Sequence, residues 1–407
     1  MIDTAGHATA AAHELPAPVT VDTGGPLHGI VVIDFTQVFM GPSCTQMLGD
    51  YGADVIKIER PDLGDLSRTS IADPAGLDNP IFLSINRNKR SVLADLRDPA
   101  VHARVMELVA TSDVVVSNFR PGVMERLGFG YEDVRKVNPR VIWAAGSGFG
   151  SRGPLAEQGG QDVIAQAYSG VLGRSAGPDG SLNIYTTSLC DYTTGMHLVQ
   201  GVLMALYYRE RTGRGQRVEV NMLDSMLHMQ MQEAAMELNR GYEINWATMP
   251  LTGVFHTADS PICVVGAFKQ DALSRICRAL GLPTDLAQDD RFDTRAKMDA
   301  RREELHAIFA GVITTDTAAN WLARFEREGV LCAPIRTLPE ALGDEQARVN
   351  GSVVEVRHPT LGPIRTVKAP IDMSATPASY RLPPPAIGEH TGQIIGAASQ
   401  PAANETT

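Results

Sequence analysis

The first third of the chain alternates between short apolar runs and segments with helical character. Apolar runs occur at 30–33, 54–59, 92–96, 113–116 and 141–145, and Gly or Pro marks several of the boundaries between them. Runs that are apolar at most positions, rather than at every second one, predict strands buried on both faces, as in parallel sheets. The alternation therefore predicts an α/β fold in which helices cover a Rossmann-like parallel sheet.

The length of 407 residues exceeds what one simple core usually organises, so we expect more than one domain. We predict a large Rossmann-like domain built from 26–223 and 336–397, and a smaller α/β domain at 224–335. Residues 1–25 are rich in Ala, Thr and Pro without periodicity, which predicts a flexible arm. Residues 398–407 predict a disordered tail.

Charge, cysteine usage and the N-terminal composition exclude several classes of protein. The formal net charge of −11 argues against nucleic acid or an anionic membrane as a partner. The five cysteines are scattered without a CxxC spacing, which indicates reduced thiols and no metal site. No Lys or Arg precedes Lys57, which disfavours a secretory or mitochondrial presequence, and no apolar run is long enough to span a membrane. These features predict a cytoplasmic protein.

Asp191 precedes a long apolar helical pattern that ends near Gly213. A single Asp before a helix is most often an N-cap, because its carboxylate accepts a free backbone N–H of the first turn. Considered alone, Asp191 is therefore better explained as a cap than as a reactive group.

Basic and amide side chains recur near the ends of the predicted strands. In open α/β sheets, ligands bind beyond the carboxyl ends of the strands, and Arg side chains suit phosphate oxygens. Each side chain singly is better explained as a solvated surface charge, but their recurrence favours a phosphate-bearing ligand. They are Arg60, Lys89, Arg90, Arg97, Asn118, Arg120 and Arg126.

The glycine pattern disfavours a nicotinamide cofactor. A dinucleotide fold would carry GxGxxG after the first strand, whereas 35–42 lacks those glycines although Glu59 stands where the ribose-binding acid is expected. Other glycines, at Gly146, Gly148 and Gly150 and at Gly159–Gly160, indicate either a close ligand approach or simple turns.

Five segments, considered together, identify a protein family more specifically than any of these motifs does alone. They are Gly52–Arg60, Asn118–Gly122, Asp191–Gly195, Arg211–Gln216 and Gly388–Thr391. With them the chain resembles the class III CoA-transferases, which include formyl-CoA and carnitine-CoA transferases, with the α-methylacyl-CoA racemases as a related branch. The resemblance extends from about Leu27 to Thr391.

The resemblance implies that Asp191 is the catalytic carboxylate. Our hypothesis for the mechanism is that Asp191 is a nucleophile and carries CoA as a covalent aspartyl thioester. Coenzyme A would enter as an acyl-CoA substrate, by default succinyl-CoA, and no metal would be needed. The resemblance also implies an interlocked homodimer. The CoA site would include Gln37, Val38, Arg60, Arg97, Asn118, Phe119, Arg120 and Arg126.

Departures from the family pattern narrow the expected chemistry. Formyl-CoA transferases have His and Gln where this chain has Gln37 and Phe39, and their glycine-rich substrate loop is not found, so oxalate is disfavoured as acceptor. The pair Gln161–Asp162 lacks the imidazole that racemases use as a second base, which favours transfer over isomerisation with Asp191 as base.

Three other functions stay open: an acyl-CoA racemase or other isomerase, a non-catalytic acyl-CoA-binding protein and a dehydrogenase. For a transferase we expect backbone N–H groups near Gly148 and Gly195 to stabilise the oxyanion. Cys190 and His197 are expected to be structural rather than reactive.

Overall fold

The computed structural model of the protein describes residues 24–71, 79–174, 180–266 and 268–396. The expected N-terminal arm lies outside the described residues except for Gly24 and Gly25, and the expected C-terminal tail lies outside them entirely. The chain forms two compact units, one up to Met229 and from Val354 onward, and one from Gln230 to Val353. Each unit is described separately below.

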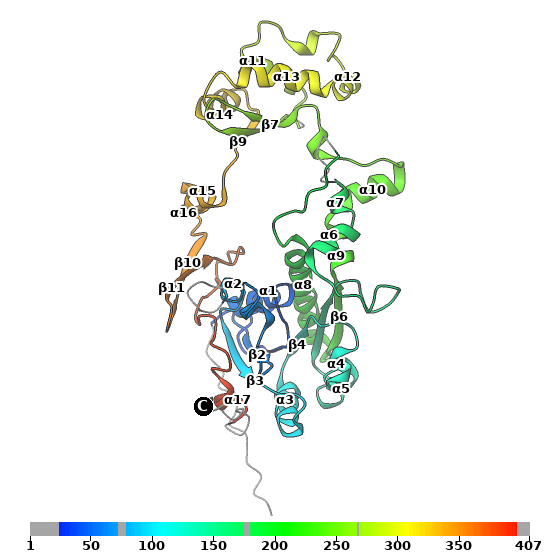
Figure 1. Ribbon diagram of the computed structural model, residues 1–407, viewed down its shortest axis with the longest axis vertical. Helices are drawn as coiled ribbons and strands as arrows, with labels where there is room; N and C mark the ends of the chain where they lie inside the picture. The colour runs from blue at the N-terminus through cyan, green and yellow to red at the C-terminus, as the bar shows by residue number, and fades with distance from the viewer. Residues whose placement is uncertain (1–23, 72–78, 175–179, 267, 397–407) are drawn as a thin grey trace, which may run out of the picture. The chain divides into compact units, whose positions relative to one another are not determined.

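A six-stranded sheet is the centre of the first unit (Figure 1), and each pair of neighbouring strands in it is parallel. The strand order is β3-β2-β1-β4-β5-β6, so the order reverses between β1 and β4. In such sheets the reversal leaves a crevice at the carboxyl ends of the strands, where ligands bind. The α/β fold predicted from the sequence is confirmed. The strands are β1 (Val31–Asp34), β2 (Asp54–Glu59), β3 (Lys89–Leu93), β4 (Val114–Ser117), β5 (Ile142–Ser147) and β6 (Gln216–Asn221).

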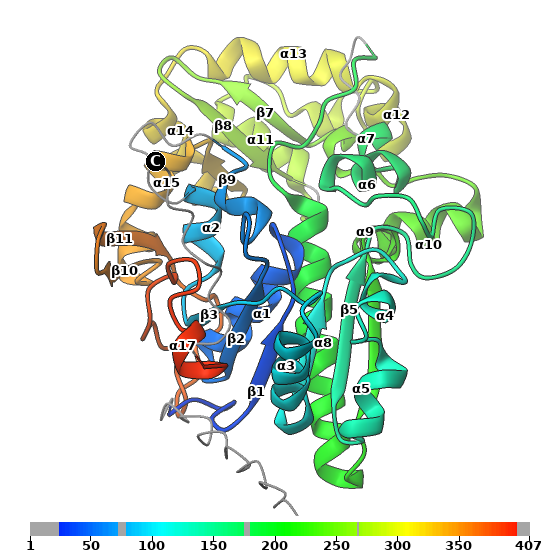
Figure 2. The ribbon, with the colours of Figure 1, turned by 60° about the horizontal axis from the view of Figure 1, so that its bottom comes forward.

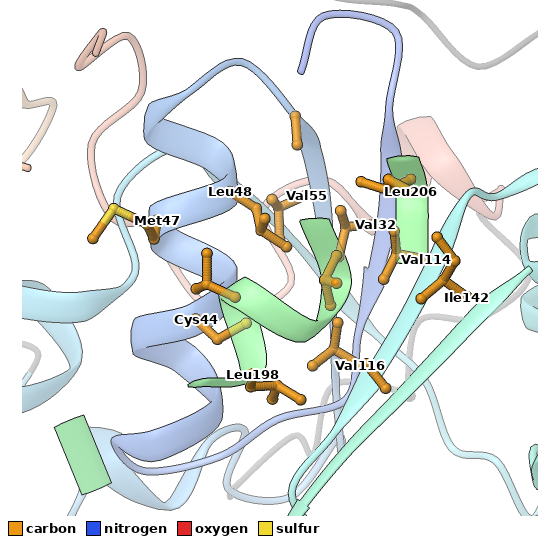
Figure 3. Close-up of a cluster of buried hydrophobic side chains, with 14 of the residues drawn as sticks. Val32, Cys44, Met47, Leu48, Val55, Val114, Val116, Ile142, Leu198 and Leu206 are labelled. Carbon is orange, nitrogen blue, oxygen red and sulfur yellow. The ribbon is translucent and has the colours of Figure 1, made fainter. Parts of the chain in front are cut away.

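Helices cover both faces of this sheet and bury a separate core on each. On one face, α1 (Met40–Asp50) and α8 (Leu189–Thr212) pack Leu48 and Leu198 against Val32 and Val116 of the strands (Figure 3). The other face is covered by α3 and its neighbours (Figure 2). Val105 and Phe129 are buried there with Ile33 of β1. The elements of this second layer are α3 (Pro99–Thr111), α4 (Val123–Arg126), α5 (Tyr131–Val137) and α17 (Thr391–Ile394).

Two elements differ from the sequence-based expectation. The strand expected at 92–96 lies at Lys89–Leu93, because Lys89 and Arg90 are buried in ion pairs that a hydropathy pattern does not reveal. The helix expected at 125–137 is divided into α4 and α5, because Gly128 adopts a left-handed conformation with φ of 76°.

The C-terminal segment covers the edge strand β3. The Thr391 Oγ1 accepts a 2.9 Å hydrogen bond from the Leu93 N–H, and the His390 N–H donates to the Ser91 carbonyl at 2.9 Å. The Gly388 N–H donates to the Ser91 Oγ at 2.8 Å. These bonds occupy part of an edge that would otherwise expose unpaired backbone groups.

The rest of the first unit is formed by shorter elements around the sheet. They are a 3₁₀ turn at Leu66–Arg68, α2 (Pro80–Ile85), α6 (Asp162–Tyr168), α7 (Val171–Arg174), α9 (Met222–Met229), and the two-stranded sheet of β10 (Val353–His358) and β11 (Gly362–Val367).

The second unit has its own core around a three-stranded antiparallel sheet, in the order β7-β8-β9. Ile262, Phe309, Trp321 and Phe325 are buried at its centre. Its elements are α10 (Met231–Arg240), a 3₁₀ turn at Trp246–Thr248, β7 (Thr252–His256), β8 (Pro261–Val265), α11 (Ala272–Leu280), a 3₁₀ turn at Leu286–Gln288, α12 (Arg295–Ala300), α13 (Arg302–Ile313), α14 (Ala318–Arg327), β9 (Leu331–Pro334), α15 (Leu338–Gly343) and α16 (Glu345–Val349).

Across the part of the chain that the structure describes, no helix has the length and apolar character needed to cross a bilayer.

Candidate active site

Two adjacent pockets open at the point where the strand order reverses. The outer pocket has a volume of about 430 Å³ and is lined by Arg60 and Arg97, among others. The Asp191 pocket has a volume of about 520 Å³ and contains Asp191. Both are lined by Gln37, which follows β1, and Phe119, which follows β4. The two pockets therefore lie at the carboxyl ends of the strands, where the fold predicts a ligand.

The loop between β1 and α1 lines both pockets and is held by hydrogen bonds to its backbone. The Asn118 Oδ1 accepts from the Gln37 N–H at 2.8 Å, and the Asn118 Nδ2 donates to the Gln37 carbonyl at 2.7 Å. Asp65 accepts from the Val38 N–H at 3.0 Å. Val38 has a φ of 68°, which a β-branched residue rarely adopts, so these contacts maintain a strained loop.

A buried ion pair supports this loop from below. The Lys57 Nζ lies 2.8 Å from Asp65 and donates to the Thr36 carbonyl at 2.7 Å, and both charged side chains are fully buried. Burial alone would raise the pKa of Asp65, but the Lys57 ammonium lowers it to about 2. Sequence reasoning missed this pair; the available signal was a lysine inside an otherwise apolar strand.

Asp191 lies in the first turn of α8, whose N-cap is Ser188. The Asp162 carboxylate accepts hydrogen bonds from the Cys190 N–H at 2.7 Å and the Asp191 N–H at 3.0 Å. Asp162 therefore caps the helix, and the interpretation of Asp191 as a cap is wrong. Among the described residues, no donor forms a hydrogen bond to the Asp191 carboxylate, which lines the pocket.

The pKa of Asp191 departs strongly from that of an ordinary aspartate. Burial, and after it the neighbouring Asp162 carboxylate, raise the pKa of Asp191 to about 7. A carboxylate with a raised pKa is a stronger base and nucleophile than a solvated one. Perturbed groups of this kind concentrate at functional sites.

The glycines noted in the sequence allow backbones to approach one another. A Cβ on Gly148 would collide with Gly160, and a Cβ on Gly160 with Gly148, so the loop that contains Gly159 packs directly on the loop after β5. A Cβ on Gly159 would lie 2.6 Å from the Arg120 Nη2. Both loops line the Asp191 pocket.

The expectation that Gly195 supplies an oxyanion N–H is wrong. Gly195 lies inside α8, where its N–H belongs to the helix, and a Cβ there would lie 2.6 Å from the Met40 carbonyl oxygen. This close packing brings α8 against the N-terminus of α1. Phe39 and Met40 at that end line the Asp191 pocket, and no side chain within the described ranges caps it.

The structure divides the expected CoA-site residues among several places. Arg60 and Arg97 line the outer pocket, and Val38, Asn118 and Arg120 line the Asp191 pocket. Arg126 is exposed on α4 and is in neither lining.

Lys89 and Arg90 do not belong to a ligand site, contrary to the strand-end pattern. The Lys89 Nζ lies 3.2 Å from Asp34 with both side chains fully buried, and Arg90 pairs with Asp54 at the start of β2. Burial lowers the pKa of Lys89 to about 8. Both residues are therefore paired inside the sheet and not directed at a ligand.

Cys190 and His197 are near Asp191 in the sequence and could suggest a thiol nucleophile or an imidazole base, but both pack against other residues. Cys190 is buried with Met226, and burial raises the pKa of its thiol to about 12, which keeps it protonated. The His197 ring packs against His228 with centroids 5.5 Å apart, outside the Asp191 pocket. In the described ranges, no three His, Cys, Asp or Glu side chains are grouped so that they could hold a metal ion.

Comparison with known proteins matches nearly the whole chain to one family. The model of CoA-transferase family III matches residues 27–391. The chain is 34% identical to a succinyl-CoA:glutarate CoA-transferase of Mus musculus, over 92% of this chain and 86% of that one. It is 32% identical to a formyl-CoA:oxalate CoA-transferase of Bradyrhizobium diazoefficiens, over 91% and 92%. The crystal structure of a CAIB/BAIF family protein from Brucella suis is similar with a TM-score of 0.80 at 29% identity, over 91% and 98%.

Proposed function

The chain belongs to CoA-transferase family III, and from this we propose that it moves CoA from succinyl-CoA to a carboxylic acid through a covalent thioester on Asp191. One observation carries the proposal: a carboxylate with a pKa of about 7 lines a pocket at the carboxyl edge of the sheet. The succinyl-CoA donor is supported by the name of the mouse relative, which covers most of this chain.

In the proposed reaction, Asp191 is the nucleophile. One of its oxygens attacks the thioester carbonyl carbon, the C–S bond breaks, and CoA leaves as the thiolate with a mixed anhydride on Asp191. The thiolate then attacks the aspartyl carbonyl carbon and expels the donor acid, which leaves an aspartyl-CoA thioester. An acceptor carboxylate attacks that thioester, and the same steps in reverse release the new acyl-CoA and restore Asp191.

Each of these additions places a negative charge on a former carbonyl oxygen. The N-terminus of α1 lines the pocket with Phe39 and Met40, and the first N–H groups of a helix have no intrahelical partner. Such N–H groups, together with the positive end of the helix dipole, stabilise an oxyanion. The hydrogen bonds that Asn118 and Asp65 make to the preceding loop would hold these donors in position.

The CoA moiety would occupy the outer pocket and reach the Asp191 pocket past Gln37 and Phe119. Arg60 and Arg97 stand at the outer pocket as candidate contacts for CoA phosphates. Asn118 would act mainly by positioning Gln37, because its amide oxygen and nitrogen both bond to that backbone.

A raised pKa would also suit a general base, so isomerisation at the carbon next to the thioester is the competing activity. Two-base exchange needs a second proton carrier across from Asp191. The described lining of the pocket includes Gln161 along with Asp191 and contains no His, which favours transfer.

We also infer an interlocked homodimer. One face of α8 leaves Leu203, Met204, Tyr207 and Tyr208 exposed, with Met204 and Tyr207 each 67% exposed. An apolar face of this kind on a central helix supports self-association. Analytical ultracentrifugation at micromolar concentration tests this, and a monomer would contradict it.

Mass spectrometry of the Asp191 peptide tests the proposed function. The protein is incubated with succinyl-CoA, glutaryl-CoA or acetyl-CoA and then treated with hydroxylamine, which converts an aspartyl thioester into a hydroxamate. We expect a donor-dependent hydroxamate on Asp191, and Asp191→Asn is the control that cannot form it.

Two results would contradict covalent transfer. One is the absence of the hydroxamate with every donor while CoA transfer proceeds. The other is α-proton exchange of a 2-methylacyl-CoA in deuterated water that is lost in Asp191→Asn, without any adduct; this would indicate an isomerase.

A further inference from the structure

We propose that Arg120 recognises the distal carboxylate of a dicarboxylic acid, both in the acyl group of the donor and in the acceptor. The inference rests on the proposed function, since it assigns the substrate class of the Asp191 pocket. It separates Arg120 from the arginines of the outer pocket, with which the sequence pattern grouped it.

The main chain of Arg120 is fixed by a tight turn. The Val123 N–H donates to the Arg120 carbonyl at 3.2 Å, with Pro121 and Gly122 between them. Gly122 has φ of 83° and ψ of −9°, the conformation of the third position of a type II turn, where proline is common at the second. Pro121 also restricts Arg120 to extended conformations. The base of the side chain is therefore held in a defined direction.

The guanidinium lies against the wall of the Asp191 pocket. It contacts Gly159, where an added Cβ would stand 2.6 Å from the Arg120 Nη2. The neighbouring Gly160 packs on Gly148 of the loop after β5, and all four residues line the pocket. Glycine at 159 thus leaves the space that the guanidinium occupies.

The charges of this pocket are complementary to a dicarboxylic acid. Among the described lining residues, Arg120 is the one cation and Asp191 the one carboxylate. No described carboxylate is paired with Arg120, whereas Arg60 and Arg97 at the outer pocket each pair with a nearby aspartate. A planar guanidinium without a partner is suited to bind a carboxylate with two parallel hydrogen bonds.

Arg120 and Asp191 are separate from one another within the pocket. Among the described residues, no ion pair joins these two side chains, which agrees with the pKa of Asp191, raised by burial and by the Asp162 carboxylate. A substrate whose reacting carbon lies at Asp191 would therefore direct its other end, rather than the reacting one, toward Arg120. A monocarboxylic substrate would leave the guanidinium without a partner and gain less from binding.

Paired substrates that differ only in the distal carboxylate test the proposal. Calorimetry measures the binding of glutarate and of valerate to the wild type, Arg120→Gln and Arg120→Lys. Steady-state kinetics compares succinyl-CoA with butyryl-CoA. Arg97→Gln, at the outer pocket, is the matched control. Gly159→Ala is a second variant, in which the added methyl displaces the guanidinium without removing its charge.

We expect Arg120→Gln to weaken glutarate binding and to lower kcat/KM for succinyl-CoA by about 10- to 100-fold, with valerate and butyryl-CoA changed by about 2-fold or less. Arg120→Lys and Gly159→Ala should show part of the same selective loss. Arg97→Gln should affect succinyl-CoA and butyryl-CoA equally.

Equal losses for both members of each pair in Arg120→Gln would overturn the proposal, because they would assign Arg120 to the common CoA moiety. Unchanged glutarate binding would overturn it as well. If the proposed function is wrong, the wild type forms no adduct on Asp191, which is a separate measurement. The calorimetric comparison of glutarate with valerate does not depend on that result.

Discussion

The outer pocket and the Asp191 pocket share Gln37 and Phe119, but they differ in whether their charged side chains have ion-pair partners. At the outer pocket, Arg60 lies 3.2 Å from Asp62 and Arg97 lies 2.8 Å from Asp95, so each cation has an anion beside it. In the Asp191 pocket, Arg120 and Asp191 line the wall without ion-pair partners among the described residues. Arg120 is exposed, but Asp191 is partly buried, where an unpaired carboxylate reduces stability, so the presence of Asp191 there points to the chemistry that the pocket performs.

The comparison predicts that a change at Asp191 abolishes transfer and leaves CoA binding intact. In Asp191→Asn the nucleophile is lost, so CoA transfer should fall by about 1,000-fold or more. The outer pocket is unchanged, so the dissociation constant of CoA should change by about 3-fold or less. Stopped-assay kinetics and calorimetry measure the two quantities. A parallel loss of CoA affinity would contradict the assignment of CoA binding to the outer pocket and of the covalent step to Asp191.

Beneath both pockets, Asp65 should be required for stability. Asp65→Ala removes the partner of the fully buried Lys57 and one anchor of the Val38 loop. Breaking a buried pair from one side costs about 3–5 kcal/mol, so the free energy of unfolding should fall by that amount. Urea denaturation measures it. Asp62→Ala, in the exposed pair with Arg60, is the control and should cost about 0.5 kcal/mol or less. A cost below about 1 kcal/mol in Asp65→Ala would contradict this account.

A smaller effect is expected at the outer pocket. Arg97→Gln should raise KM by about 3- to 10-fold, by the same factor for every acyl-CoA, since this pocket would bind the part that all donors share. The effect should shrink at high salt, because Arg97 is exposed. The control is Arg104→Gln, an exposed arginine of α3 that pairs with Glu107. A change in KM that depends on the acyl group would contradict the assignment of the outer pocket to the CoA part of the substrate.

The smallest expected effect is a shift in pH dependence. The ionised form of Asp191 is the nucleophile and its pKa is raised to about 7, so kcat/KM should rise with pH and level off above about pH 7. Asp162→Asn removes the second cause of the raised pKa but keeps an oxygen for the helix N–H groups. The inflection should therefore move to lower pH, by roughly one unit or less, because burial remains. An inflection that stays in place or moves upward would contradict this explanation.

The sequence predicted the fold well because strand burial leaves a direct signature in hydropathy, as at 30–33 and 113–116. It failed at β3, where ion pairs, rather than apolar side chains, fill the interior at Lys89 and Arg90. It also assigned one role to all the strand-end arginines. The separation of Arg120 from Arg97 depends on which loop each side chain contacts, and no local pattern encodes that.

The cap of α8 also could not be predicted from local sequence. A helix N-terminus accepts any suitably placed carboxylate, so the sequence could not reveal that Asp162, rather than Asp191, would fill that position. The strained Val38 was likewise invisible, because its conformation is imposed by Asp65 and Asn118 from distant parts of the chain.

The bonds between the C-terminal segment and β3 have a consequence for synthesis of the chain. Leu93 and Thr391 are 298 residues apart. At about 5–20 residues per second, a ribosome needs roughly 15–60 s to make the intervening segment. During that interval the edge of β3 opposite β2 has no covering segment. Nascent chains on neighbouring ribosomes would present the same open edge to one another, so this edge is a place where chains can pair wrongly during translation.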